Sequence, residues 1–177
     1  MVDITHKTRT LRSAIAEATV VLSSEAALSA LVEGRVPKGN VFEMAKTAGL
    51  FAVKRTADMV PDCHPIPVEY TAVRYDVQGM EVRIEIEVKA IYRTGVEVEA
   101  MHGASVIALT MYDMLKPLDK GNGIRNIRLV KKKGGKTDWK DEFKGDLRAA
   151  VVAVCSDSVP QQVRSRTARG RSSSPSL

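Results

Sequence analysis

Three charged side chains stand where they could bind an anion or transfer a proton. Lys38 lies in a turn between Pro37 and Gly39, directly before a predicted helix, where its ammonium and the free N–H groups of the helix start could meet one anion. Asp113 and Lys116 are three residues apart within another predicted helix and therefore lie on one face. An exposed turn lysine and a surface ion pair worth about 0.3 to 0.5 kcal/mol would explain the same residues. The residues alone leave both interpretations open.

A proline-rich loop carries Asp62, Cys63 and His64 in succession. A Cys–His metal site would need two further ligands, and the other histidines, His6 and His102, lack ligand spacing, so we expect no metal. His64 is then a loop histidine, a packed structural histidine or a residue that contacts a ligand.

Two carboxylates, Glu97 and Glu99, flank Val98 at the start of a predicted helix. Acidic residues favour the first helical turn because of the helix dipole, so these two are also consistent with a structural role. A basic run, Lys131–Lys133 followed by Lys136, comes after the last predicted strand. It is either a solvated basic end or a phosphate-binding segment.

The elements that must position these residues follow from the periodicity of the apolar side chains. The clearest signal is the alternation of Val82, Ile84, Ile86 and Val88 with charged residues, which predicts a strand. The expected elements are a strand at 12–22, helices at 23–34 and 40–57, strands at 68–77 and 82–88, a helix at 97–118 and a strand at 124–130. This order predicts an α+β fold of ferredoxin-like type, a plait in which helices pack on one face of an antiparallel sheet.

The composition predicts a globular chain inside the cell. Its 177 residues are 44% hydrophobic and 27% charged, which suits one folded domain. Cys63 and Cys155 do not form a disulfide framework, so we expect a reducing, cytoplasmic location. No signal peptide or membrane span is expected. Half of the net charge of +6 lies within residues 151–177, and the rest does not require nucleic acid as a partner.

The character of the chain changes near Leu147. A short hydrophobic stretch, Val151–Val154, is followed by a segment rich in Arg, Ser and Gln without aromatic residues. Such a segment cannot bury enough apolar area to offset its ordering entropy. We therefore expect one domain over residues 1–146, and a hydrophobic stub with a disordered tail over 147–177.

Four stretches resemble the signature of the cyclic pyranopterin monophosphate synthase family, which acts in molybdenum-cofactor biosynthesis. They are MVDIT at the start, KGNVFEMAKTAGLFAVKRT at 38–56, CHP at 63–65 and TGVEVEAMHGASVIALTMYDMLK at 94–116, with GGK at 134–136. The resemblance covers roughly residues 1–138. It implies an enzyme that rearranges a cyclic dihydroguanosine triphosphate and closes a cyclic phosphate with loss of diphosphate, without a cofactor.

The resemblance also implies roles for residues and an assembly. The catalytic residues would be Asp113, Lys116 and Lys38. Lysines crowded together could have lowered pKa values, as a lysine general base requires. The family's pattern further implies that the substrate is bound by Asp62, Cys63, His64, Glu97, Val98, Glu99 and Lys136. The family forms homohexamers, trimers of dimers, whose pockets draw residues from two subunits.

Some residues depart from the family's pattern, and other functions have to be weighed. Asp62 stands where an apolar residue is expected, and His102 where small residues or threonine are usual, which puts substrate affinity in question. The stub at 147–158 resembles the opening strand of a molybdopterin adenylyltransferase-like domain.

One alternative function is that of an RNA-binding plait, against which the 5% aromatic content argues. Another is an inactive relative that serves only in assembly, against which the intact Lys38, Asp113 and Lys116 argue.

Overall fold

The structure, a computed structural model, describes residues 1–141, within a compact unit that spans Met1–Glu142. The stub and tail expected over 147–177 lie outside the described residues. The elements are β1 (Thr10–Val21), α1 (Glu25–Val32), α2 (Val41–Lys54), α3 (Thr56–Met59), β2 (Tyr70–Gln78), β3 (Glu81–Tyr92), α4 (Glu97–Leu115), β4 (Gly123–Lys133) and β5 (Trp139–Lys140).

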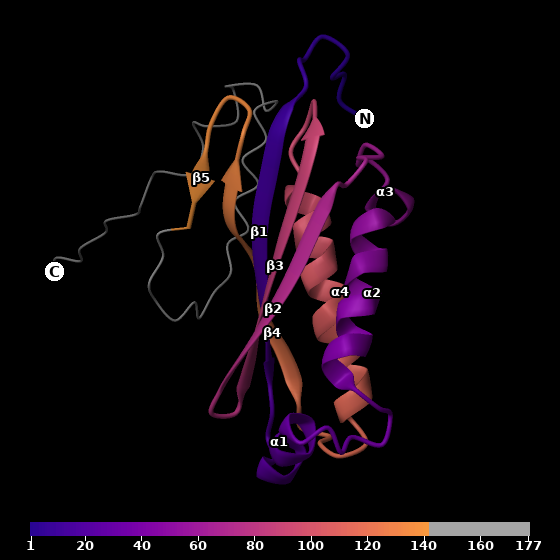
Figure 1. Cartoon of the computed structure of the whole chain (residues 1–177), viewed down its shortest axis with the longest axis vertical. Coiled ribbons are helices and arrows are strands. Elements are labelled where there is room, and N and C mark those ends of the chain that lie inside the picture. Colours follow the sequence, from indigo (N-terminus) through magenta and orange to yellow (C-terminus); the bar gives the residue numbers. More distant parts are fainter. Residues whose placement is uncertain (142–177) are drawn as a thin grey trace, which may run out of the picture. The chain divides into compact units, whose positions relative to one another are not determined.

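The strands form one five-stranded sheet in the order β2-β3-β1-β4-β5, with antiparallel neighbours throughout. The long helices α2 and α4 cover one face of this sheet (Figure 1). Strand β3 lies between β1 and β2, and β1 lies between β3 and β4, so each helical connection joins two strands with one strand between them. This is the arrangement of a ferredoxin-like plait, and the fold class predicted from the sequence is confirmed.

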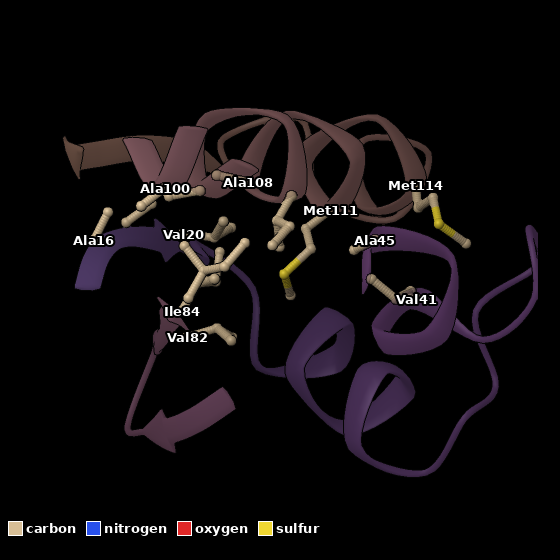
Figure 2. Close-up of a cluster of buried hydrophobic side chains, with 14 of the residues drawn as sticks. Ala16, Val20, Val41, Ala45, Val82, Ile84, Ala100, Ala108, Met111 and Met114 are labelled. Atoms are coloured by element: carbon tan, nitrogen blue, oxygen red, sulfur yellow. The ribbon is translucent and has the colours of Figure 1, made fainter. Parts of the chain in front are cut away.

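The core lies between the sheet and the helices. Even-numbered residues of β1 and β3, from Ala14 to Val20 and from Val82 to Ala90, face the helices and are at most 1% exposed. Helix α4 covers them with small and flexible side chains, among them Ala100, Ala108 and Met111 (Figure 2). Strict period-2 burial of β3 explains why its alternation was readable from the sequence, whereas in β1 Glu17 and Thr19 of the other face are buried as well.

Helices α2 and α4 approach each other through glycines. A Cβ atom on Gly49 of α2 would lie 2.3 Å from the Ile107 side chain of α4, and one on Gly103 would lie 2.7 Å from Ile86 and Val53. Any larger residue at either position would push the helices apart. The contact therefore sets how α2 and the turn before it lie against α4.

Two boundaries differ from the sequence prediction for local reasons. The helix expected over 40–57 ends at Lys54, and a single turn, α3, follows after Arg55. The Thr56 hydroxyl donates back to the carbonyl of Ala52 or Val53, which lie 3.1 and 3.2 Å away, and such bonds often bend helices. Strand β4, expected to end at residue 130, continues through three lysines to Lys133. Lysine is depleted in strands, so the sequence pattern did not indicate this extension.

None of the helices within residues 1–141 combines the length and apolar character needed to cross a membrane.

Candidate functional site

Lys38, Asp113 and Lys116 form one ion cluster, which we call the Lys–Asp–Lys cluster. The Lys38 ammonium donates to Asp113 Oδ2 at 2.6 Å and to the Asp113 carbonyl at 2.9 Å. Lys116 Nζ lies 2.7 Å from the other carboxylate oxygen, Oδ1. One carboxylate thus binds two ammonium groups, each on its own oxygen, and all three side chains are partly open to solvent.

Local structure places Lys38 beside the end of α4. The Gly39 N–H donates to the Val36 carbonyl at 2.9 Å and closes the turn that carries Lys38. The Asn40 side chain then accepts from the Glu43 N–H at 3.1 Å and caps the start of α2. Because α2 runs antiparallel to α4, its start lies beside the end of α4, where Asp113 and Lys116 are located (Figure 1).

The charges in this cluster stabilise one another. Hydrogen bonds from Lys116 and Lys38 lower the pKa of Asp113 to about 2. The hydrogen bond to Asp113 raises the pKa of Lys116. The expectation that crowding lowers the lysine pKa is therefore wrong for Lys116, because its nearest charged neighbour is an anion and not another lysine. In this state Lys116 is an ammonium, prepared to donate a proton or to neutralise a phosphate.

A second group of functional candidates surrounds a hollow at the start of α4. Its volume is about 440 Å³, and we call it the His64–Glu99 hollow. Its polar lining is provided by His64 of the proline-rich loop, Glu99 of α4, Lys54 at the end of α2, and Thr56 and Asp58 of α3. Tyr92 and three residues of the loop, Pro65, Ile66 and Pro67, add apolar surface. Such a combination of apolar walls and a few converging polar groups is typical of a small-molecule site.

Glu99 is the most perturbed acid in the hollow. It is only 3% exposed, and burial, with a smaller contribution from the charge of Glu97, raises its pKa to about 7. The carboxyl can therefore carry its proton near neutral pH and donate a hydrogen bond, or lose the proton and accept one. A buried acid with such a pKa in a hollow is a candidate for substrate contact or proton transfer.

We expect the stability of the protein to fall as the pH rises through the range in which Glu99 titrates. The folded pKa of about 7 exceeds the ordinary value of 4.5, so the folded state binds more protons between these values. The free energy of unfolding should then decrease by about 3 kcal/mol from pH 4.5 to pH 7. Urea unfolding of the wild type and of Glu99→Gln across this range provides the measurement. Equal pH slopes in the two proteins would contradict a buried, titrating Glu99.

The other predicted binding residues lie around this end of α4 but outside the lining of the hollow. Glu97 forms an ion pair with Lys132 of β4 at 3.1 Å, and its neighbour Val98 is 42% exposed. Lys136 is exposed in the turn between β4 and β5. The structure thus brings Glu97 together with the basic run through Lys132, a residue that sequence reasoning treated only as part of that run.

The proline-rich loop orients its three candidates differently. His64 Nε2 lies 2.9 Å from the Val2 carbonyl, and because a carbonyl only accepts, Nε2 carries a proton and donates. Asp62 points to solvent and pairs with the Met1 ammonium at 2.8 Å, and that interaction lowers its pKa. Burial raises the pKa of the Cys63 thiol, which keeps the thiol protonated.

His102 has a partner that the sequence did not reveal. Its Nδ1 lies 3.2 Å from the hydroxyl of Thr56, whose own proton is used toward the α2 carbonyls. The ring nitrogen therefore donates, and the pair joins α4 to the wall of the His64–Glu99 hollow. The only signal in the sequence was a histidine at a position where small residues or threonine are usual. That signal did not identify Thr56 as the partner of His102.

The two groups of candidates lie at opposite ends of α4. Glu97 opens the helix and Asp113 closes it, sixteen residues later, which corresponds to about 24 Å at the rise of an α-helix. Figure 1 shows the loop before β2 and the start of α4 at one end of the helical layer, and the start of α2 at the other. Within one chain, the Lys–Asp–Lys cluster and the His64–Glu99 hollow are therefore separate.

Comparison with known proteins gives a consistent match. The model of the MoaC family matches residues 1–135. A protein named cyclic pyranopterin monophosphate synthase from Pelobacter propionicus is 47% identical over 77% of this chain and 86% of its own length. Proteins of the same name from Thermomicrobium roseum and Clostridium perfringens are 44% and 42% identical, over 80% and 77% of this chain and 87% of each relative. The matched family segment includes the Lys–Asp–Lys cluster and the His64–Glu99 hollow, and Lys136 lies just beyond it.

Proposed function

Because the chain belongs to the MoaC family, we propose that it is a cyclic pyranopterin monophosphate synthase of molybdenum-cofactor biosynthesis. In this proposal it converts a cyclic dihydroguanosine triphosphate into cyclic pyranopterin monophosphate and releases diphosphate. The observation that carries the proposal beyond the family match is the Lys–Asp–Lys cluster. Two ammonium groups held on one carboxylate supply both proton donors and positive charge for a triphosphate.

The cluster suits the phosphate part of the reaction. When a sugar hydroxyl attacks the phosphorus next to the ribose, the hydroxyl loses a proton and the bond to the leaving diphosphate breaks. Lys38 and Lys116 are assigned to the proton transfers and to the charge that develops on the phosphate oxygens. Asp113 orients both lysines and holds Lys116 in its ammonium form. Lys136 is assigned to phosphate binding.

The hollow at the other end of α4 suits the ring of the substrate. A guanine-derived ring presents amino and N–H donors, for which carboxylates are good acceptors. We assign Glu97 and Glu99 to this edge, with His64 and the neighbouring residues Asp62, Cys63 and Val98 around it. A pKa of about 7 lets Glu99 either accept from a ring N–H or return a proton during the rearrangement.

A complete site requires the two ends of α4 to come from different copies of the chain. The separation of about 24 Å within one copy supports this arrangement. Apolar side chains on the outer surfaces of the helices, Met44, Phe51, Val98 and Leu109, are 42% to 58% exposed and offer area for such a contact. We propose a homohexamer built from dimers, active in the cytoplasm, where Cys63 stays free.

The function is tested by incubating the full chain with the cyclic triphosphate and measuring released diphosphate and the pterin product. Product formation that depends on enzyme concentration and is lost in Lys38→Ala is the expected result. A chain that binds the triphosphate and forms no pterin would overturn the proposal and support an inactive assembly partner.

We expect two inactive variants to restore activity when they assemble together. Lys116→Ala damages one end of α4 and Glu99→Gln the other, so a mixed dimer keeps one site with both wild-type halves. Random reassembly of equal amounts makes half of the dimers mixed, and about a quarter of the wild-type activity should return. The assay compares the reassembled mixture with each variant reassembled alone. A mixture no more active than the sum of its parents would show that one copy carries the whole site.

A further inference from the structure

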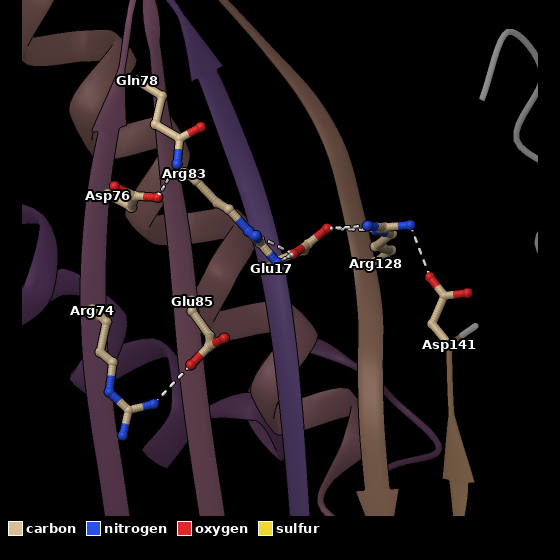
Figure 3. Close-up of polar contacts among 8 residues, drawn as sticks. All are labelled: Glu17, Arg74, Asp76, Gln78, Arg83, Glu85, Arg128 and Asp141. Carbon is tan, nitrogen blue, oxygen red and sulfur yellow. Dashed lines mark hydrogen bonds and ion pairs between the residues drawn. The ribbon is translucent and has the colours of Figure 1, made fainter. Parts of the chain in front are cut away.

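The face of the sheet opposite the helices carries many charged side chains. Positive and negative charges are paired in its middle and are not fully paired near one end. In its middle, each arginine meets a carboxylate (Figure 3). Arg83 and Arg128 both bind Glu17, at 2.9 Å from Arg83 Nε and 2.5 Å from Arg128 Nε, and Arg128 also reaches Asp141 at 2.8 Å. On the neighbouring strands Arg74 pairs with Glu85 at 2.7 Å. This part of the face needs no further ion.

Near one end of the same face, lysines outnumber carboxylates. Ser13 of β1 stands in register between Lys89 of β3 and Lys133 of β4. In the next row, Ile15 stands between Glu87 and Lys131. These six residues line a hollow of about 230 Å³, the outer hollow, which corresponds to the space of about seven water molecules.

Among the residues that the structure describes, only one of the three lysines around the outer hollow has a carboxylate partner. Lys89 pairs with Glu87 at 3.0 Å and lies over the ring of Tyr70, 4.6 Å from its centre. Lys131 and Lys133 form no ion pair with any residue of the described 1–141. Lys131 also stands directly opposite Lys140 of β5, and like charges in opposed positions destabilise a sheet.

The geometry points to an anion site: we propose that the outer hollow binds an oxyanion of the phosphate class with at least two negative charges. Lys131 and Lys133 provide two ammonium groups that form no ion pair within residues 1–141. Lys89 is held in place by Glu87 and Tyr70, and the Ser13 hydroxyl adds a neutral donor. The ligand is either a free anion such as diphosphate or the phosphate groups of a nucleotide. This site is separate from the proposed catalytic residues and does not depend on the proposed reaction.

The alternation of side chains along β4 allows the outer hollow to be tested separately from the His64–Glu99 end of the molecule. Successive residues of β4 point to opposite faces, so Lys132, between the two lysines of the outer hollow, turns to the helix side and pairs with Glu97. Changes at Lys131 and Lys133 therefore act on one face, and a change at Lys132 acts on the other.

Isothermal titration of the full chain with inorganic diphosphate at low salt tests the proposal. The wild type should bind at two classes of site, and Lys131→Gln with Lys133→Gln should weaken one of them at least tenfold while leaving the second. Lys132→Gln, which removes one charge from the opposite face of the same strand, should leave the outer-hollow class unchanged. The matched control is Lys46→Gln in α2 with Lys120→Gln in the loop after α4, which removes the same charge outside the outer hollow and should retain both classes.

Separate titrations with orthophosphate and with GTP distinguish the two sources of the ligand. Tighter binding of GTP than of diphosphate at the site lost in the double variant indicates a nucleotide, and the reverse order indicates a free anion. Thermal unfolding confirms that the double variant is folded. The proposal is overturned if the double variant binds diphosphate like the wild type, or if Lys132→Gln or the charge-matched control loses the same site as the double variant.

Discussion

Replacing Lys116 or Lys38 by alanine is expected to lower turnover at least about a hundredfold, because each change removes a positioned proton-transfer group. Both side chains are partly exposed, and their ion-pair partner within residues 1–141 is Asp113, so the melting temperature should stay close to that of the wild type. Steady-state release of diphosphate provides the rate, and thermal unfolding shows that the fold is intact.

Further variants separate proton transfer from charge. Lys116→Arg keeps the positive charge and the contact with Asp113, but a guanidinium does not give up its proton at neutral pH. If Lys116 moves a proton, this variant should be nearly as slow as the alanine variant. Lys46→Ala in α2 and Lys120→Ala in the loop after α4 serve as controls and should leave turnover unchanged. Turnover near the wild-type rate in Lys116→Ala or Lys38→Ala would refute the catalytic assignment.

Replacing Glu17 by alanine is expected to lower the free energy of unfolding by about 3 kcal/mol, the largest loss we expect from a single charged side chain. The Glu17 side chain is 5% exposed and binds Arg83 and Arg128 on the two neighbouring strands. Removing the carboxylate leaves the guanidinium groups of Arg83 and Arg128 close together without the negative charge between them. Because both arginines remain partly in water, the loss should lie at the lower end of the range for buried ion pairs.

The matched control is Glu81→Ala, on the same sheet face. Glu81 of β3 pairs with Arg125 of β4 across the intervening strand β1, and both side chains are nearly half exposed. Such a pair should contribute less than about 1 kcal/mol. Urea denaturation of the two variants gives the comparison. Equal losses in Glu17→Ala and Glu81→Ala would show that burial of Glu17 adds nothing to stability.

The sequence predicted those parts of the fold and site that depend on neighbours along the chain. Alternation in β3 and the spacing of Asp113 and Lys116 are local properties, and both predictions were confirmed. The contact of Lys38 with Asp113 joins residues 75 positions apart, and only the packing of α2 on α4 through Gly49 and Gly103 creates it. The pairing of Thr56 with His102 likewise depends on two helices meeting. The separation of the two candidate groups, in contrast, already follows from the single helix predicted over 97–118, which places Glu97 and Asp113 sixteen residues apart.

The central position of β1 in the sheet also governs how the chain is made. Its nearest sheet partner, Glu81 opposite Val21, is synthesised about 60 residues later, which takes about 3 to 12 s at ordinary rates of translation. During that interval both edges of a strand rich in alanine and valine are without hydrogen-bond partners, and such edges recruit other chains. The helices α1 and α2 emerge in this window and can cover only its inner face. The pace of the ribosome between residues 22 and 81 therefore sets how long the nascent chain is open to aggregation.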